Sequence, residues 1–286
     1  MAKIKIKSFA NKDDQYKWLV ENLPALNAQR RSEPKKADPL MFVSYAIDER
    51  GERIKAESND SGTQEATTDT GVIKVRCVIN TTNLLDSHCD VHLPGIWKKS
   101  IQELKQMFLC YEHTLTYKGI LSDEIKVYTK KISWKELGFD FEGETEALVF
   151  DVVMKKEFIY EENRFMYDRY KAGKVYNHSV RMQYIKEYFC LNSEDANATQ
   201  YKENWDKYRP MVANGEDADA RGWFYAVTEA KIIEGSAVVR GSNCATPTME
   251  VEDCEDKGQA DNNSLDNTEE NEPPQGTQKS YYQGLI

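Results

Sequence analysis

Short apolar runs separated by polar turns dominate the chain from Gly71 onward. They are rich in Val, Ile, Tyr and Phe: VIKVRCVIN, MFLCY, IKVYTKKISW, ALVFDVVM, VYNHSVRMQYI and FYAVTEAKIIEGSAVV. Runs of this length and composition, bounded by turn residues, are typical of strands in an antiparallel sheet or barrel. The pattern therefore predicts a β core built mainly from antiparallel strands.

Four other stretches carry apolar residues at the i, i+3, i+4 spacing of an amphipathic helix. They are residues 13–30, 96–108, 157–171 and 198–212. Pro24 lies inside the first and is expected to break or kink that helix, because proline lacks the N–H that the helix ladder needs. Helices that interrupt a run of strands predict the α+β class, here a mainly antiparallel β-barrel core with surrounding helices.

Two polar segments divide the chain into parts. Residues 57–71 (ESNDSGTQEATTDTG) have no apolar periodicity and are interpreted as a flexible linker or a long hairpin loop. Residues 249–286 are too polar to offset the entropy of ordering, so an acidic disordered tail is expected. A main domain at residues 72–248 lies between them. Residues 1–56 form an N-terminal extension with one helix and a β-rich segment at 41–47.

Composition and charge exclude several classes of protein. With 286 residues, 40% of them hydrophobic, the chain can bury a sizeable core, and no apolar run approaches the roughly 18 residues of a membrane-spanning helix. The net charge is −10, but ten acidic residues and only two lysines follow from Met249 on, so the rest is close to neutral. A nearly neutral body argues against direct binding of nucleic acid, which depends on clustered Lys and Arg.

The N-terminus and the cysteines indicate a protein that stays inside a cell. The sequence MAKIKIKSFANKDDQ has neither the apolar stretch nor the small-residue cleavage site of a secretory signal. Six cysteines are scattered without a CxxC pair, so we expect reduced thiols rather than a disulfide framework or a zinc ribbon.

The four histidines limit where histidine-dependent chemistry can occur; they are His88, His92, His113 and His178. His88, Asp90 and His92 alternate onto one side of a strand and could be proposed as metal ligands together with the nearby Cys89. The favoured interpretation is a polar loop that ends at a Pro-Gly turn. We therefore expect no metal and no cofactor.

A hydrolytic triad is the other chemistry that the residues allow. His113 follows an apolar strand, and Ser179 lies in VYNHSVRMQY, where a Ser on a strand face is ordinarily solvent-facing. Glu229 and Glu234 stand in an otherwise apolar strand and need partners, because an unpaired buried carboxylate is costly. Spacing alone does not decide the matter, since triads are recognised by geometry and not by sequence order.

Four sequence blocks carry a resemblance that bears on this choice. NLLDSHCDVHLPGIW contains the pattern Asp-x-x-x-Asp-Val-x-x-Pro-Gly-x-aromatic, and FLCYEHTLTYKGI is a strand that ends in His113 and is followed by a turn with Gly119. GKVYNHSVRMQY bears Ser179, and AVTEAKIIEGSAVVRGSNCATPT holds a Glu-x-Ser strand and a turn of small residues. In this order the blocks resemble the prohead maturation proteases of tailed phages, relatives of the herpesvirus assemblin proteases.

The resemblance covers residues 71–248 and implies an assemblin-like fold with a serine endopeptidase site. Ser179 would be the nucleophile and His113 the general base. Glu234 would orient His113, with Glu229 as the alternative, because the two glutamates face opposite sides of a strand. Backbone N–H groups near Ser179 or after Val239 would bind the oxyanion, and the neighbouring Arg240 could add a positive charge there.

Two features depart from the family pattern. Arg181 stands where the family usually has Gly two residues after the nucleophile, which leaves the oxyanion environment and the level of activity open. The stretch at about residues 191–221 is longer than in compact members and is interpreted as an inserted helical segment.

The resemblance also implies a biological setting. The protease would act in the host cytoplasm inside the assembling prohead, cutting the major capsid protein, the scaffold protein and its own termini. A homo-oligomer is expected, with a dimer as one form. The alternative is a capsid-assembly factor that keeps the fold but has little or no protease activity.

Overall fold

The computed structural model describes residues 6, 9–32, 70–156 and 160–254. The helices of this part are α1 (Lys12–Ser32), α2 (Lys98–Gln102), α3 (Glu161–Lys171), α4 (Thr199–Tyr208) and α5 (Gly215–Arg221). The strands are β1 (Val72–Thr81), β2 (Asp90–His92), β3 (Leu109–Tyr111), β4 (Ile120–Ser122), β5 (Ile125–Ser133), β6 (Glu144–Lys155), β7 (Asn177–Leu191), β8 (Trp223–Val238) and β9 (Thr248–Asp253). The predicted strand at 41–47, residues 57–69 of the predicted linker and residues 255–286 of the predicted tail lie outside the described residues.

The strands form two sheets. The first has the order β5-β6-β1-β9 and is antiparallel throughout. In the second, the long strand β8 pairs with β7 along one edge and with β2 and β3, one after the other, along its other edge. β2 and β3 run parallel to β8, while β7 runs antiparallel to it and β4 antiparallel to β3. The predicted α+β class and the mainly antiparallel pairing are therefore confirmed.

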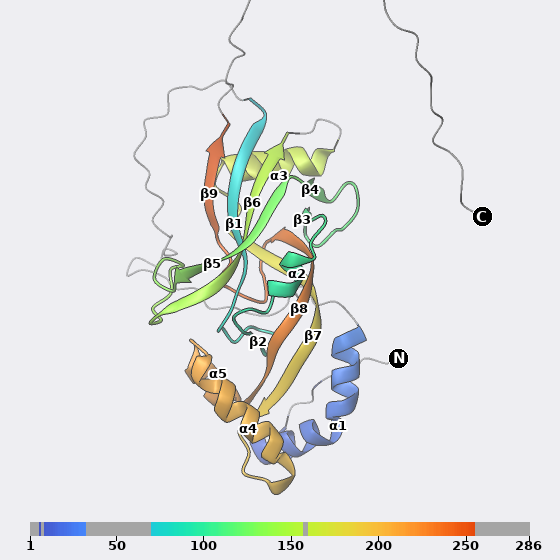
Figure 1. Ribbon diagram of the computed structural model, residues 1–286, viewed down its shortest axis with the longest axis vertical. Coiled ribbons are helices and arrows are strands. Elements are labelled where there is room, and N and C mark those ends of the chain that lie inside the picture. Colours follow the sequence, from blue (N-terminus) through green and yellow to red (C-terminus); the bar gives the residue numbers. More distant parts are fainter. Residues whose placement is uncertain (1–5, 7–8, 33–69, 157–159, 255–286) are drawn as a thin grey trace, which may run out of the picture. The chain divides into compact units, whose positions relative to one another are not determined.

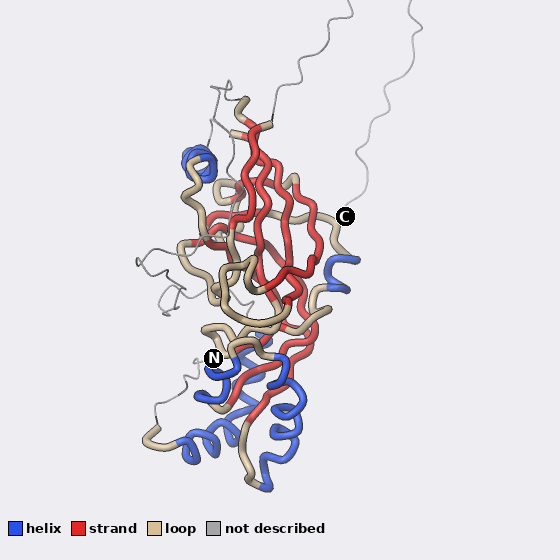
Figure 2. The backbone as a smooth tube through the Cα atoms, turned by 90° about the vertical axis from the view of Figure 1, so that its left-hand side faces the viewer, coloured by secondary structure: helices blue, strands red, loops and turns tan. Residues whose placement is uncertain are grey.

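The barrel in that prediction is not confirmed, because the hydrogen-bonded ladders of the described strands do not close. One half of the β7–β8 ribbon packs on the first sheet through apolar residues such as Phe150, Ile79 and Met182. The other half extends beyond that sheet, where α1, α4 and α5 surround it (Figure 1). Figure 2 shows the same division, with most strands at one end and most helices at the other. Helices thus cover the apolar faces that a closed barrel would have buried.

The predicted helices are largely present. α1 extends through Pro24 as a single assigned helix, and Figure 1 shows that its course bends, as expected for an interior proline. The predicted inserted segment contains α4 and α5. Residues 96–108 give only the short helix α2, because the chain must next extend into β3, where Leu109 pairs with Gly235. No helix among the described residues is long and apolar enough to cross a membrane.

The predicted start of the disordered tail is too early. Residues 249–253 belong to β9, which pairs with β1. Arg76 of β1 joins the two neighbouring strands, because its guanidinium contacts Asp151 of β6 at 2.8 Å and Glu250 of β9 at 2.6 Å. Composition alone does not show these cross-strand contacts, because they depend on which strands pair. The compact unit therefore extends to Cys254.

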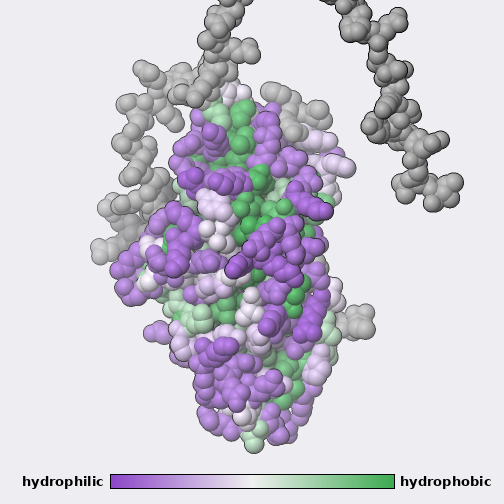
Figure 3. Space-filling view, in the orientation of Figure 1, coloured by the Kyte–Doolittle hydropathy of each residue, from purple (hydrophilic) through white to green (hydrophobic). Residues whose placement is uncertain are grey.

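The surface of the described part is mostly hydrophilic in the view of Figure 3, as expected for a chain with 30% charged residues. On the face shown in Figure 3, hydrophilic residues cover most of the described surface, and hydrophobic residues show between them in smaller patches. The largest buried side chains lie instead inside the two layers and include Trp97, Trp134 and Phe150.

Gly235 of β8 packs closely against side chains of the first sheet. A Cβ atom at this position would lie 2.6 Å from Cε2 of Phe150, which is too close, and 3.1 Å from Cδ1 of Ile79, which is a tight contact. We expect Gly235→Ala to lower the free energy of unfolding by about 1–3 kcal/mol, the usual cost of overpacking a core. Denaturant unfolding measures this loss. The same substitution should cost less in a Phe150→Leu background, and equal costs in both backgrounds would contradict the contact with Phe150 as the cause.

Candidate active site

Three adjacent strands bring the predicted catalytic residues to one region of the second sheet. β8 lies in the middle, and its Ser236 pairs with Cys110 of β3 on one side and with Ser179 of β7 on the other. His113 follows β3 by two residues. Glu234 precedes Ser236 by two residues, so alternation places both on the same face of β8. Directly opposed residues of an antiparallel pair share a face, so Ser179 belongs to it as well.

His113 and Glu234 form a short buried contact. Nδ1 of His113 lies 2.6 Å from Oε1 of Glu234, and the two side chains are 5% and 0% exposed. A carboxylate accepts, so the neutral imidazole carries its proton on Nδ1 and keeps its lone pair on Nε2. Nε2 is the atom with which a general base removes the proton of a nucleophile.

Ser236 holds this pair in place. Its hydroxyl donates to Oε2 of Glu234 at 2.6 Å, so both oxygens of the carboxylate have a donor. The same hydroxyl oxygen accepts the backbone N–H of His113 at 3.1 Å. Ser236 is fully buried and its proton is committed to Glu234, which makes it a positioning residue and a poor nucleophile. The sequence interpretation had no role for Ser236, although the Glu-x-Ser spacing was the signal for it.

The backbone that carries His113 is unusual. Glu112 and His113 both have left-handed conformations, with φ of 49° and 57°. Such angles are uncommon in residues other than glycine and persist only where surrounding contacts hold them. Here the N–H of Glu112 donates to the carbonyl of Ala237 at 3.1 Å, and the N–H of Thr114 donates to Tyr111 at 2.8 Å. Strained residues of this kind concentrate at functional sites.

The structure decides which of the two glutamates can orient His113. Glu229 is one-third exposed, and its carboxylate lies 3.6 Å from Nζ of Lys99 near the surface. Glu234 contacts His113 and is fully buried. Only Glu234 is therefore placed to orient the imidazole.

Ser179 lies opposite Ser236 on the neighbouring strand β7. Ser179 is 5% exposed and borders a small cavity that is also lined by Asn80, His92, Ser242 and Asn243. Within the part of the chain that the structure describes, no hydrogen bond joins Ser179 to His113. Cβ atoms of opposed residues lie roughly 4.5–5.5 Å apart, so the Ser179 hydroxyl starts one strand away from Ser236. Catalytic hydrogen bonds are often long or absent until substrate is bound.

The loop after β8, residues 239–247, folds back over the start of β7. The N–H of His178 donates to the carbonyl of Thr246 at 3.0 Å, and the Thr246 hydroxyl donates back to the carbonyl of His178 at 2.7 Å. Gly241 allows the close approach, because a Cβ there would lie 2.8 Å from the carbonyl oxygen of His178 and 3.7 Å from Cβ of Ser179. Backbone of this loop thus borders Ser179, whereas Arg240 is exposed. The oxyanion donors expected there stay a prediction.

Two further residues on this face affect its chemistry. Burial, with a contribution from the negative charge of Glu234, raises the pKa of the Cys110 thiol to about 12, so the thiolate needed of a cysteine nucleophile does not form near neutral pH. Arg181 pairs in register with Glu234, yet its Nε is buried without a hydrogen-bond partner, and no ion pair between the two is found in the described residues. A positive charge therefore stands beside the candidate triad.

His178 lies in the core, where its ring contacts groups of the fold. His178 is fully buried, and its ring nitrogens contact the hydroxyl of Tyr170 at 2.9 Å and the carbonyl of Thr246 at 3.2 Å. Burial lowers the pKa of His178 to about 4, so the ring stays neutral.

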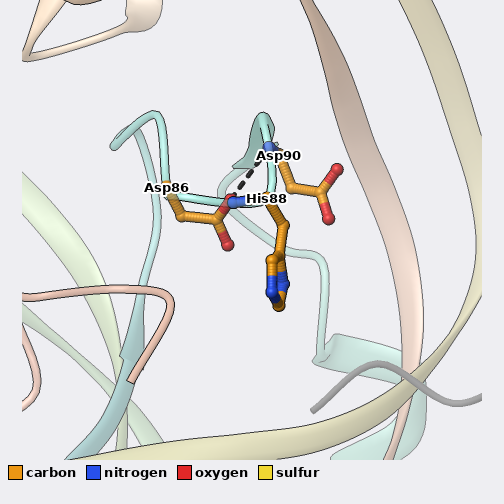
Figure 4. A group of neighbouring side chains, drawn as sticks. All are labelled: Asp86, His88 and Asp90. Atoms are coloured by element: carbon orange, nitrogen blue, oxygen red, sulfur yellow. Dashed lines mark hydrogen bonds between the residues drawn. The ribbon is translucent and has the colours of Figure 1, made fainter. Parts of the chain in front are cut away.

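The cluster considered for a metal differs from the one that the sequence suggested. Figure 4 shows Asp86, His88 and Asp90, whose possible ligand atoms lie within 4.8 Å of one another, while His92 does not belong to the group. Oδ1 of Asp86 accepts the N–H groups of His88 and Asp90, each at 2.9 Å. The Asp90 carboxylate contacts Arg30 at 2.6 Å and accepts the hydroxyl of Tyr184 at 2.7 Å. These bonds give both carboxylates partners within the protein.

Comparison of the chain with protein-family models, with curated proteins and with solved structures finds no match.

Proposed function

We propose that this chain is a serine endopeptidase that uses Ser179 as nucleophile, His113 as general base and acid, and Glu234 as the orienting carboxylate. The observation that carries the proposal is the buried contact between His113 and Glu234, braced by Ser236 and placed one strand away from Ser179. Glu234 is fully buried, accepts from two donors and contacts a histidine that follows the end of β3. Such an arrangement is typical of functional sites and is not needed in a simple scaffold.

The residues would act in two stages. Nε2 of His113 takes the proton of Ser179 while Oγ attacks the substrate carbonyl, and Glu234 stabilises the resulting imidazolium. Backbone N–H groups of the loop 239–247 or of β7 would donate to the oxyanion. The imidazolium then protonates the leaving amine, the peptide bond breaks, and an ester on Ser179 remains. Water, deprotonated by His113, hydrolyses this ester and restores the hydroxyl.

The resemblance to prohead maturation proteases extends this proposal to substrates and location. The natural substrates would be the major capsid protein, the scaffold protein and the chain's own extended segments, cut inside the assembling prohead in the host cytoplasm, where the protease would act as a homo-oligomer. An assembly factor with little or no activity is the second candidate. The observation in its favour is that no hydrogen bond joins His113 to Ser179 in the described residues.

A fluorophosphonate probe separates the two candidates without a known substrate. An activated serine displaces fluoride from phosphorus and keeps the phosphonyl group on Oγ, so we expect a mass increase on the peptide that contains Ser179. Ser242→Ala is a matched control that should label normally, because Ser242 lines the same cavity and its side chain has no part in the proposed mechanism. Heat-denatured protein should not react. Absence of labelling in the folded wild-type chain would favour the inactive assembly factor.

A further inference from the structure

A continuous series of buried polar side chains connects the N-terminal helix α1 to the loop 239–247. At the α1 end, Nη2 of Arg30 lies 2.6 Å from Oδ1 of Asp90, and the hydroxyl of Tyr184 donates to Oδ2 of Asp90 at 2.7 Å. That hydroxyl also lies 2.9 Å from Nε2 of His92. The series therefore runs from α1 through β2 and β7 to the ring of His92 within three contacts.

The second half of the series reaches the loop. Nδ1 of His92 lies 3.0 Å from Nδ2 of Asn80 in β1. Oδ1 of Asn80 in turn accepts Nδ2 of Asn243 at 2.7 Å. Asn243 also donates to the carbonyl of Thr81 at 3.0 Å and accepts the N–H of Ala245 at 2.9 Å, so its side chain fixes the turn of the loop.

The donors and acceptors agree along the whole series. Because the Tyr184 hydroxyl donates to Asp90, it must accept from Nε2–H of His92, which leaves Nδ1 of that ring to accept from Asn80. Burial lowers the pKa of His92, which keeps the ring in the neutral form that this arrangement requires. Every member thus has one defined orientation, and each orientation depends on the next.

Arg30 is the anchor at the α1 end. Its side chain is 10% exposed, contacts Glu187 of β7 at 2.8 Å as well as Asp90, and places its guanidinium carbon 3.7 Å from the ring centre of Tyr225. A buried cation with two carboxylate partners and an aromatic face fixes both the helix and the carboxylate that orients Tyr184.

The other end of the series lies at the candidate active site. Asn80, His92 and Asn243 line the same small cavity as Ser179, and Gly241 of the loop approaches Ser179 directly. We propose that Arg30 is a positioning residue of this site: α1 fixes the loop 239–247 beside Ser179 through Asp90, Tyr184, His92 and Asn80. The role at Ser179 rests on the proposed function. The N-terminal helix α1 then contributes to the geometry of the site by positioning the loop 239–247.

Tyr184→Phe is the sharpest test, because it removes the hydroxyl that joins His92 to Asp90 and leaves the Arg30 ion pairs in place. We expect the rate of fluorophosphonate labelling at Ser179 to fall about 10- to 100-fold, since small misplacements remote from the reacting atoms have effects of this size. Amide hydrogen exchange of residues 241–246 should accelerate. Tyr208→Phe is the matched control, a buried tyrosine of α4 outside the series that should change neither measurement.

Arg30→Met tests the anchor itself, with Arg30→Lys as the conservative variant and Arg76→Met as a control at an ion pair on the other sheet. Arg30→Met should lower the labelling rate and accelerate exchange at 241–246, Arg30→Lys should recover part of both, and Arg76→Met should resemble wild type. If Arg30→Met does not fold, Tyr184→Phe decides. Unchanged labelling and unchanged exchange in folded Tyr184→Phe would overturn the proposal. A wild-type chain that never labels would instead contradict the proposed function, and the exchange measurement would still test the link between α1 and the loop.

Discussion

Replacement of Ser179 by alanine is expected to abolish fluorophosphonate labelling and the proposed cleavage of capsid and scaffold proteins, with a fall in rate of at least about 10⁴-fold. The substitution removes the oxygen that would form the acyl-enzyme. Its effect on the free energy of unfolding should stay below about 1 kcal/mol, because no hydrogen bond of this hydroxyl is found among the described residues. Intact-mass analysis of all chains after co-expression, with thermal unfolding in parallel, measures both quantities.

The same experiment tests self-processing. Residues 57–69 and 255–286 are polar in sequence, so we expect the wild-type chain to be trimmed there and the Ser179→Ala chain to stay intact. Residues 249–253 are excluded, because they belong to β9. His113→Ala should be as inactive as Ser179→Ala, and the double variant no worse, because triad members act as a unit. Identical trimming in the wild-type and Ser179→Ala chains would assign the cuts to a host enzyme and remove Ser179 from the mechanism.

Replacement of Glu234 by glutamine is expected to lower the labelling rate by up to about 10⁴-fold, the loss known for a triad whose carboxylate becomes an amide. The neutral amide cannot stabilise the imidazolium that forms when His113 takes the serine proton. One end of that amide also becomes a donor, which conflicts with the two donors that Glu234 now accepts from His113 and Ser236.

Glu229→Gln is the matched control for this prediction. It lies on the same strand, is one-third exposed and contacts only Lys99 among the ion pairs of the described residues, so its rate should stay within about twofold of wild type. Thermal unfolding of both variants separates a loss of fold from a loss of chemistry. A larger loss of activity in Glu229→Gln than in Glu234→Gln, with both folded, would show that the observed contact with His113 is not the catalytic one.

The hydrophobic pattern determined much of the architecture. Runs rich in Val, Ile and aromatic residues were sufficient to predict the long strands β6, β7 and β8, and helical spacing located α1, α3 and α4. These signals are local, because side chains two residues apart share a strand face and side chains three or four apart share a helix face. Charge and composition likewise located the polar segments, although the first tail residues were drawn into β9 by pairing with β1.

Tertiary structure decided the arrangement of the site. The alternation of β8 placed Glu234 and Ser236 on one face, but only the parallel pairing of β3 with β8 brings His113 onto that carboxylate, more than a hundred residues away in the chain. The choice between Glu229 and Glu234 depended on which of them that pairing buried.

Contacts between elements that are distant in sequence also decided two other features. These are the described sheets, which do not close into a barrel, and the series of polar side chains from Arg30 to Asn243. The N-terminal helix α1, together with α4 and α5 from the connection between β7 and β8, covers the free half of the β7–β8 ribbon, so closure into a barrel was not required to bury it. Partners such as Asp90 and Arg30, or Asn80 and Asn243, come from different elements, and no periodicity within one element encodes which of them meet. The sequence by itself determined which segments fold and which residues could react; the register between distant strands determined which of those residues touch.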